Sequence, residues 1–295
     1  MLQKKILFFY SGNNPYRISR LKEASEQAGV DYEFIDLDKI LFNNGLIESP
    51  IFLKKEFNYT GYFLGYSEIS KYVIKALEGK IIFPQKVSWE LADKFNSHIF
   101  LKRIGIATPP SALILSSNSI DELAETIGGF PCIIKKTTGG NGSLVEMVNS
   151  KKECLEFIMT AKEKITLEKV FPRAFCFLLQ KPIKESYGTD YRALCIGNKF
   201  LGIMKRTAKS EGSFKANFSL GGEVKEISEI REIREMSEKI MRKSKLFMAG
   251  IDFIKSNEGY QVLEINTSPQ FKGFEQATGE DVAGNIVNRL VQIDN

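Results

Sequence analysis

The chain has 295 residues, of which 43% are hydrophobic and 26% are charged, and its formal net charge is +5. This composition excludes a disordered chain, a collagen and a coiled-coil rod, and the length predicts about two domains. A small phosphate-bearing ligand accounts for the mild positive charge. Because no basic run exceeds two residues, we expect no nucleic-acid partner.

The cysteines and the single histidine argue against two kinds of site. The cysteines are Cys132, Cys154, Cys176 and Cys195, none of them in a CxxC pair, and the histidine is His98. A Cys/His zinc site and a Cys–His nucleophile pair are therefore disfavoured, and separate thiols suit a reducing compartment. No apolar run approaches the roughly 20 residues of a membrane helix, and the N-terminal run is too short for a signal peptide. We expect a cytoplasmic protein with no membrane partner.

Residues 1–85 predict an N-terminal domain with a parallel α/β fold. Apolar runs bounded by turn residues indicate strands, and apolar residues at helical spacing indicate helices. In chain order the expected elements are a strand over 6–10, a helix over 17–28 with Gly29 as its C-cap, strands over 32–36 and 59–66, a helix over 67–78 and a strand over 81–83. Strand, helix, strand in this order indicates parallel pairing. The loop over 11–17 follows a strand end and could line a ligand site, but an ordinary connecting loop is the simpler interpretation.

Residues 86–295 predict a larger body of helices and hairpin-connected strands. The expected helices are 89–101, 119–127 with a Ser119/Glu122 capping box, 150–161, 228–245 and 279–290. The expected strands are 131–136, 144–148, 175–180, 190–196, 200–206, 249–254 and 260–266. Turn residues at 197–198 and 256–259 join the last four strands into two hairpins.

A glycine-rich loop follows the strand that ends near Lys135. The loop covers residues 137–143 and contains Gly139, Gly140 and Gly142. A lysine beside backbone N–H groups that no side chain covers suits a phosphate. The loop lacks the GKS/T ending of a P-loop, and a flexible hairpin tip is the alternative interpretation.

Cations gather on and after the first hairpin. They are Arg192, Lys205, Arg206 and Lys215, and they are accompanied by Asp190 and Asn217. Clustered lysine and arginine side chains can stabilise the charge of a phosphate or an acyl phosphate. Surface cations without a common site are the alternative.

The last hairpin carries two carboxylates and an amide. Because side chains alternate along a strand, Asp252, Glu264 and Asn266 share a face if the register sets them side by side. The apolar residues that point the other way are then Ile251, Phe253, Leu263 and Ile265. Hard oxygen donors suit Mg²⁺ or Mn²⁺, so we predict a metal site here. A solvated sheet face is the alternative, although the apolar runs around these residues indicate that both faces are covered.

Together and in this order, these segments resemble the ATP-grasp superfamily, and specifically its RimK-type glutamate ligases. The segments that carry the resemblance are 91–94, 131–135 with the glycine loop, 190–192, 204–206, 214–217, 249–252, 263–269 and 273–279. The resemblance runs from about residue 85 to 290. It implies that an N-terminal α/β domain (1–85) precedes a two-lobed ATP-grasp domain (86–295), with an α+β lid lobe over about 105–178 and a C-terminal lobe over about 179–295.

The resemblance also implies a role for each candidate residue. Asp252, Glu264 and Asn266 hold the metal, expected as two Mg²⁺ or Mn²⁺ ions. The residues expected to bind ATP are Lys94 and Lys135 on the phosphates, Gly140, Asn141, Gly142 and Ser143 as a lid, Asp190 on the ribose, and Lys215 and Asn217 near the triphosphate. Gln180, Lys181 and Ile183 flank the adenine, where Pro182 has no N–H to donate, so recognition of the adenine either shifts to Ile183 or weakens. Arg206 stabilises the transferring phosphoryl group, with Arg192 beside it and Lys205 able to exchange roles with Arg206.

The function implied is a ligase that passes the γ-phosphate of ATP to a carboxylate, after which an amine attacks the acyl phosphate. The carboxylate belongs to a protein or peptide tail or to a small molecule, and the amine belongs to an amino acid, with glutamate favoured. Alternatives are a peptide-cross-linking ligase, a non-catalytic ATP-binding regulator and, last, an RNA-binding protein. Homo-oligomers are also implied.

Overall fold

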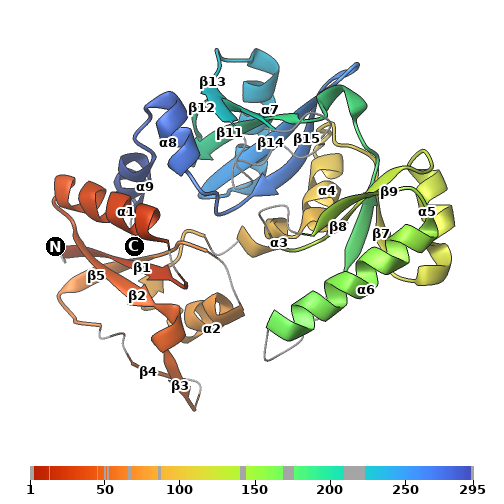
Figure 1. The fold of residues 1–295 in the computed structure, drawn as a ribbon. Coiled ribbons are helices and arrows are strands. Elements are labelled where there is room, and N and C mark those ends of the chain that lie inside the picture. The colour runs from red at the N-terminus through yellow and green to blue at the C-terminus, as the bar shows by residue number, and fades with distance from the viewer. Residues whose placement is uncertain are drawn as a thin grey trace.

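In the computed structural model of the chain, there are three larger sheets, and helices pack against each of them (Figure 1). The residues that the structure describes are 3–12, 14–44, 46–49, 51, 53–65, 68–85, 88–139, 144–168, 176–208 and 223–293. The expected mixed α/β fold class is confirmed, with one parallel sheet and two antiparallel sheets. No helix in these ranges is both long enough and apolar enough to cross a membrane.

The N-terminal sheet is parallel, as predicted. Its strands are β1 (Gln3–Tyr10), β2 (Asp31–Asp36), β5 (Phe57–Phe63) and β6 (Ile81–Ile82), in the order β2-β1-β5-β6. Helices α1 (Pro15–Gln27) and α2 (Glu68–Ala76) connect its strands. Gly29, at φ 61°, follows the first of these helices in the left-handed region that glycine tolerates best. The 3₁₀ turn η1 (Leu37–Lys39) and the small hairpin of β3 (Leu41–Asn43) and β4 (Leu46–Ser49) were not predicted.

The second sheet is antiparallel and belongs to the expected lid lobe. Its strands are β7 (Ser111–Ile114), β8 (Cys132–Lys136), β9 (Val145–Val148) and β10 (Phe177–Gln180), in the order β7-β10-β8-β9. Its helical segments are η2 (Ser117–Ser119), α5 (Ile120–Thr126) and α6 (Lys151–Glu168), and the last runs seven residues beyond its predicted end at 161. The predicted capping box is wrong: Ser119 makes no cap bond, and its hydroxyl donates to the Ser116 carbonyl instead.

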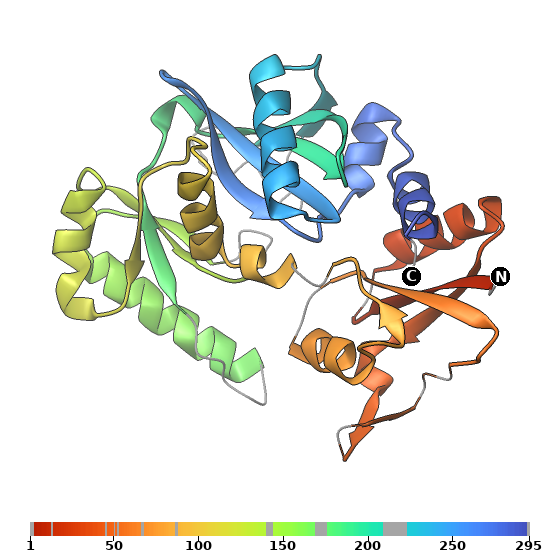
Figure 2. The ribbon, with the colours of Figure 1, turned by 180° about the vertical axis from the view of Figure 1, so that it is seen from behind.

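The third sheet is the largest. Its strands are β11 (Thr189–Ile196), β12 (Lys199–Thr207), β13 (Glu223–Glu226), β14 (Met248–Ser256) and β15 (Gly259–Asn266), in the order β13-β12-β11-β14-β15. The 3₁₀ turn η3 (Lys184–Ser186) leads into it, and α7 (Arg231–Ser244) covers one face (Figure 2). Both predicted hairpins are confirmed.

One predicted helix is replaced by a pair. The helix expected over 89–101 is α3 (Ser88–Ala92) followed by α4 (Lys94–Arg103). Asp93 separates them because its carboxylate accepts from the N–H groups of Phe95 and Asn96 and so caps the second helix. The helix expected over 279–290 is confirmed as α9 (Val282–Val291), and it is preceded by a short helix that was not predicted, α8 (Lys272–Thr278).

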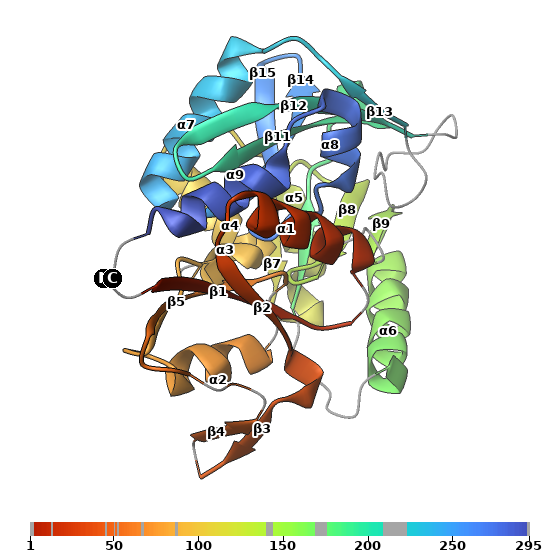
Figure 3. The same ribbon diagram turned by 90° about the vertical axis from the view of Figure 1, so that its left-hand side faces the viewer.

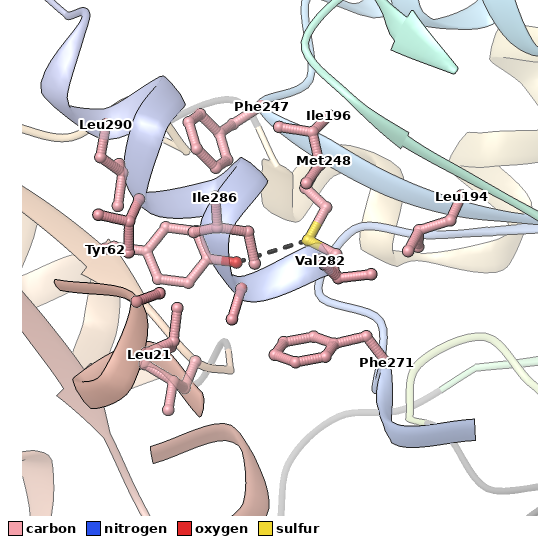
Figure 4. Close-up of a cluster of buried hydrophobic side chains, with 14 of the residues drawn as sticks. Leu21, Tyr62, Leu194, Ile196, Phe247, Met248, Phe271, Val282, Ile286 and Leu290 are labelled. Atoms are coloured by element: carbon pink, nitrogen blue, oxygen red, sulfur yellow. Dashed lines mark hydrogen bonds between the residues drawn. The ribbon is translucent and has the colours of Figure 1, made fainter. Parts of the chain in front are cut away.

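The N-terminal sheet and the third sheet share one hydrophobic core. Helix α1 packs against α9 (Figure 3). Between them, Tyr62 contacts Phe247 with ring centroids 5.4 Å apart, and Leu21 and Ile286 are fully buried beside this pair (Figure 4). The lid lobe has a separate core around Ile134. The division into an N-terminal domain, a lid lobe and a C-terminal lobe stays a proposal. The expected boundary between the two lobes at 178/179 would cut β10, so we place that boundary after β10.

Candidate active site

The third sheet brings charged residues of four strands, β11, β12, β14 and β15, onto one face. In the register, Asp190 lies opposite Arg206, Arg192 opposite Asp252, and Asp252 opposite Glu264. Residues that are paired in register project to the same side of a sheet. This face is the one opposite the core under α7, which contains Ile251. The predicted hairpin register of Asp252 and Glu264 is therefore confirmed.

Asp252 lies at the centre of this group. Arg192 donates to it twice, from Nε to Oδ1 at 2.6 Å and from Nη2 to Oδ2 at 2.7 Å. Arg206 adds a contact of 2.9 Å from Nη2 to Oδ2. Burial alone would raise the pKa of Asp252, but Arg192 and Arg206 outweigh burial and lower it to about 2. Asp252 is thus ionised at every physiological pH.

Asp190 and Arg206 form a second buried pair. Arg206 donates from Nε at 2.5 Å and from Nη2 at 2.8 Å to the two carboxylate oxygens of Asp190. Burial raises the pKa of Asp190 above its ordinary value, while Arg206 opposes that rise. Both carboxylate oxygens of Asp190 accept from the guanidinium, so Asp190 can orient Arg206. This geometry differs from the contact with ribose expected from the sequence.

Glu264 and Asn266 complete the predicted metal-ligand set. The Asn266 amide donates to Asp252 Oδ2 at 3.1 Å and to Glu264 Oε1 at 3.2 Å. Two carboxylates and an amide oxygen are hard donors that fit Mg²⁺. The described residues contain no group of three His, Cys, Asp or Glu that could hold a metal ion, so a site here would depend on the Asn266 amide oxygen beside the two carboxylates.

A bulge between the two strands changes one predicted residue. The register shifts after Asp252, so Phe253 pairs with Val262 and not with Leu263. Val262 is fully buried in the core beside Ile251, whereas Leu263 is only half-buried. The expectation that Leu263 belongs to the core-facing set is therefore wrong. The bulge inserts one residue that alternation along the chain does not reveal.

Two lysines reach the same region from the lid side. Lys94 Nζ donates to the Gly139 carbonyl at 2.7 Å and lies 3.8 Å from Glu264 Oε2. Lys135 is buried and donates from Nζ to Gln180 Oε1 at 2.9 Å. Burial lowers the pKa of Lys135 to about 8, against the opposing effect of Glu264.

One residue in this region was missed by the sequence analysis. Ser111 Oγ accepts from Gln180 Nε2 at 2.9 Å and donates to the Pro109 carbonyl at 3.0 Å. It therefore fixes the amide of Gln180, which in turn holds Lys135. The only signal near it in the sequence was the break at Pro109 and Pro110, which shows nothing of a contact that depends on strand pairing.

Lys205, Lys181 and Ile183 are the described candidates with no contact to this cluster among those given above. Lys205 pairs in register with Tyr191, which packs into the core under α7, so Lys205 lies on the opposite face from Arg206. The exchange of roles between Lys205 and Arg206 is therefore not supported by the strand geometry. Lys181 donates its backbone N–H to the Pro110 carbonyl at 2.9 Å, and Ile183 immediately precedes η3. The candidates that lie outside the described residues are Gly140, Asn141, Gly142, Ser143, Lys215 and Asn217.

Sequence comparison places this chain among known ligases. A family model described as the RimK-like ATP-grasp domain matches residues 91–290. The chain is 31% identical over 300 residues to a protein of Hahella chejuensis named probable alpha-L-glutamate ligase 1, covering 96% of this chain and 93% of that protein. A probable alpha-L-glutamate ligase of Legionella pneumophila is 35% identical over 198 residues, covering 67% of this chain and 62% of the relative.

Solved structures share the fold at low sequence identity. A RimK domain ATP-grasp protein from Sphaerobacter thermophilus superposes with a TM-score of 0.70 at 16% identity, covering 96% of this chain and 98% of that chain. The ATP-grasp ligase PsnB, complexed with a phosphomimetic variant of a minimal precursor, Mg and ADP, gives a TM-score of 0.69 at 15% identity and covers 99% of each chain. These likenesses show an ATP-grasp fold.

Proposed function

The chain belongs to the RimK-like ATP-grasp family and is an ATP-dependent carbon–nitrogen ligase, and we propose that it forms an amide between a carboxylate acceptor and an amino acid through an acyl phosphate. In the first step an acceptor carboxylate oxygen attacks the γ-phosphorus of ATP and ADP leaves. In the second step the amine attacks the acyl carbon, phosphate leaves, and the amine gives up a proton. The observation that supports this proposal is the group of four cations and three carboxylates around Asp252.

The residues of this group divide the work by charge. We assign Lys94 and Lys135 to the phosphates of ATP, and Arg206 to the phosphoryl group in transfer, with Arg192 beside it. Asp190 orients Arg206 rather than holding the ribose. Asp252, Glu264 and Asn266 would hold one or two Mg²⁺ or Mn²⁺ ions, which would supply positive charge to the phosphates of ATP.

Glutamate is the amino acid that we propose as the amine substrate. Its support is that the relatives at 31% and 35% identity are named probable alpha-L-glutamate ligases. Cross-linking within a peptide is the second candidate, because the fold is shared with PsnB, which was solved with precursor peptides. The three carboxylates and four cations of the site argue against a non-catalytic regulator.

The test is an ADP-release assay with ATP, Mg²⁺ and candidate acceptors, with and without labelled glutamate. We expect ADP release that depends on both glutamate and the acceptor, with the label incorporated into the product. A product that has lost water without taking up the label would instead identify a cross-linking ligase. Lys205→Met is the matched control for Arg206→Met: only the latter is expected to abolish turnover, since Lys205 lies on the other face of the strand. ATP hydrolysis with neither product would contradict the proposal.

Nucleotide affinity is expected to fall as the pH rises through about 8. The pKa of Lys135 is about 8, so the free protein loses this positive charge above that pH and has to regain a proton to bind a phosphate. Linkage predicts a rise in the Kd for Mg-ADP of up to about tenfold between pH 8 and pH 9. Calorimetric titrations at pH 7, 8 and 9 measure it. In Lys135→Arg, whose guanidinium stays charged, the Kd for Mg-ADP should change little between pH 7 and pH 9. An equal pH effect in both proteins would contradict the assignment of Lys135 to the phosphates.

A further inference from the structure

Arg17 is a buried cation at the junction of the N-terminal sheet and the third sheet. It lies in the first turn of α1 and is 1% exposed. Its Nη1 donates to the Leu64 carbonyl at the end of β5, and its Nη2 lies 3.4 Å from Ser268 Oγ. Its guanidinium also lies over the ring of Phe271, 5.7 Å from the centroid. Burying a guanidinium is costly, so these contacts specify one place for it.

The contacts of Arg17 with Ser268 and Phe271 reach the segment that follows β15, the strand of the proposed ligands Glu264 and Asn266. Residues 267–271 leave β15 directly after Asn266, and Thr267, Pro269 and Phe271 within the segment are buried. Arg17 contacts Ser268 and Phe271 from the N-terminal side. One arginine of the N-terminal domain therefore holds the segment at two points.

Pro269 connects this segment to the charged group. A Cβ added at Gly250 would lie 2.9 Å from Pro269 Cβ and 3.5 Å from Arg192 Cδ. Pro269 and the aliphatic part of Arg192 therefore both lie against Gly250, which pairs with Asn266 in the register. Pro269 and Arg192 are thus both packed around one residue of β14. Contacts at Gly250 therefore make a path that links the segment 267–271, which Arg17 contacts, to the arginine that holds Asp252.

We propose that Arg17 is a positioning residue: through the segment 267–271 and Pro269 it holds Arg192 in its two-bond contact with Asp252. The inference rests on the proposed function, because it assigns the N-terminal domain a part in assembling that same site. Arg17 itself is too buried to touch a substrate. Its effect is expected on the chemical step, since small displacements of catalytic groups cost rate more than binding.

Arg20 provides a matched control at the same junction. It lies one turn further along α1 and pairs with Glu275 at 3.2 Å and with Asp281 at 2.8 Å. Neither partner belongs to the segment 267–271. Arg20→Gln therefore weakens the junction without entering the path, and a purely structural role of Arg17 would give the same result as this variant.

The experiment compares Arg17→Lys, Gly250→Ala and Arg20→Gln in the full chain. We expect Arg17→Lys and Gly250→Ala to lower kcat for ADP release about 10-fold to 100-fold, with the Kd for Mg-ADP changed less than about threefold. The double variant should be no worse than the stronger single one, because both act on one path. Arg20→Gln should lower the melting temperature and leave kcat within about twofold. Gly250→Ala enters the path from its other end, so it tests the proposal even if Arg17→Lys fails to fold.

Hydrogen exchange separates failure of this inference from failure of the proposed function. The expected result is faster exchange in β14 and in residues 267–271 in Arg17→Lys and Gly250→Ala, but not in Arg20→Gln, whatever reaction the protein catalyses. Faster exchange in the two path variants, together with no ligase turnover in the unchanged protein, would contradict the proposed function but support the positioning role of Arg17. An unchanged kcat in both path variants, additive losses in the double variant, or the same pattern in Arg20→Gln would overturn the inference.

Discussion

Replacing Glu264 with glutamine is expected to lower ADP release by at least about 100-fold while the chain stays folded. The side chain of Glu264 is 22% exposed, lies 3.8 Å from Lys94 and accepts from the Asn266 amide at 3.2 Å. Glutamine keeps the shape and an oxygen for the Asn266 amide, but it removes the negative charge that a divalent cation needs. Steady-state ADP release measures the activity, and a thermal melt within a few degrees of the unchanged protein shows that the fold is kept.

The control for this variant is an exposed glutamate of the same sheet. Glu223, the first residue of β13, is exposed and pairs with Thr207, which shares with Lys205 the face opposite the charged group. Glu223→Gln should release ADP at the normal rate. Partial rescue of Glu264→Gln by raised Mg²⁺ would strengthen the metal assignment, because a weakened site fills at higher concentration. Full turnover of Glu264→Gln at ordinary Mg²⁺ would remove Glu264 from the metal site.

Local sequence pattern predicted the hairpin that carries the proposed metal ligands. Alternation places Asp252 and Glu264 on one face, and the short turn after Ser256 brings them opposite each other. The alternation and the turn residues both lie within about fifteen residues of sequence, so the hairpin can be predicted without knowing any distant contact. The bulge at Leu263 escaped prediction because it depends on how two strands share one core, and the sequence of either strand alone does not encode it.

Contacts between distant segments could not be predicted in the same way. Asp190 carries the pattern of a ligand-binding aspartate, and only the pairing with β12 shows that both of its oxygens accept from Arg206. Lys205 and Arg206 are indistinguishable until the register assigns one to each face. Arg17 gives no signal at all, because its partners Leu64 and Ser268 are 47 and 251 residues away.

Short elements were lost for a different reason. Strands β3, β7 and β13 have three or four residues each, which is too short for alternation to be distinguished from chance. Helices α3 and α4 were merged because their apolar stripe is nearly continuous, while the break depends on the capping carboxylate of Asp93. That carboxylate directs Lys94 into the site, so the missed break has a functional consequence.

Asp252→Asn should abolish activity as Glu264→Gln does, but it should also destabilise the fold by about 3–5 kcal/mol. The side chain of Asp252 is 3% exposed and neutralises both Arg192 and Arg206. Removing its charge leaves the buried guanidinium of Arg206 with Asp190 alone and takes the carboxylate partner from the half-buried Arg192. Chemical denaturation of both proteins measures the difference in free energy of unfolding.

Because the pKa of Asp252 falls from 3.8 to about 2 on folding, the stabilisation by its charge is complete above pH 3.8 and is lost as the pH falls toward 2. The difference between the two proteins should therefore stay constant from pH 5 to pH 8. A difference below about 1 kcal/mol, the range of an exposed ion pair, would contradict the central position of Asp252 in this charged group.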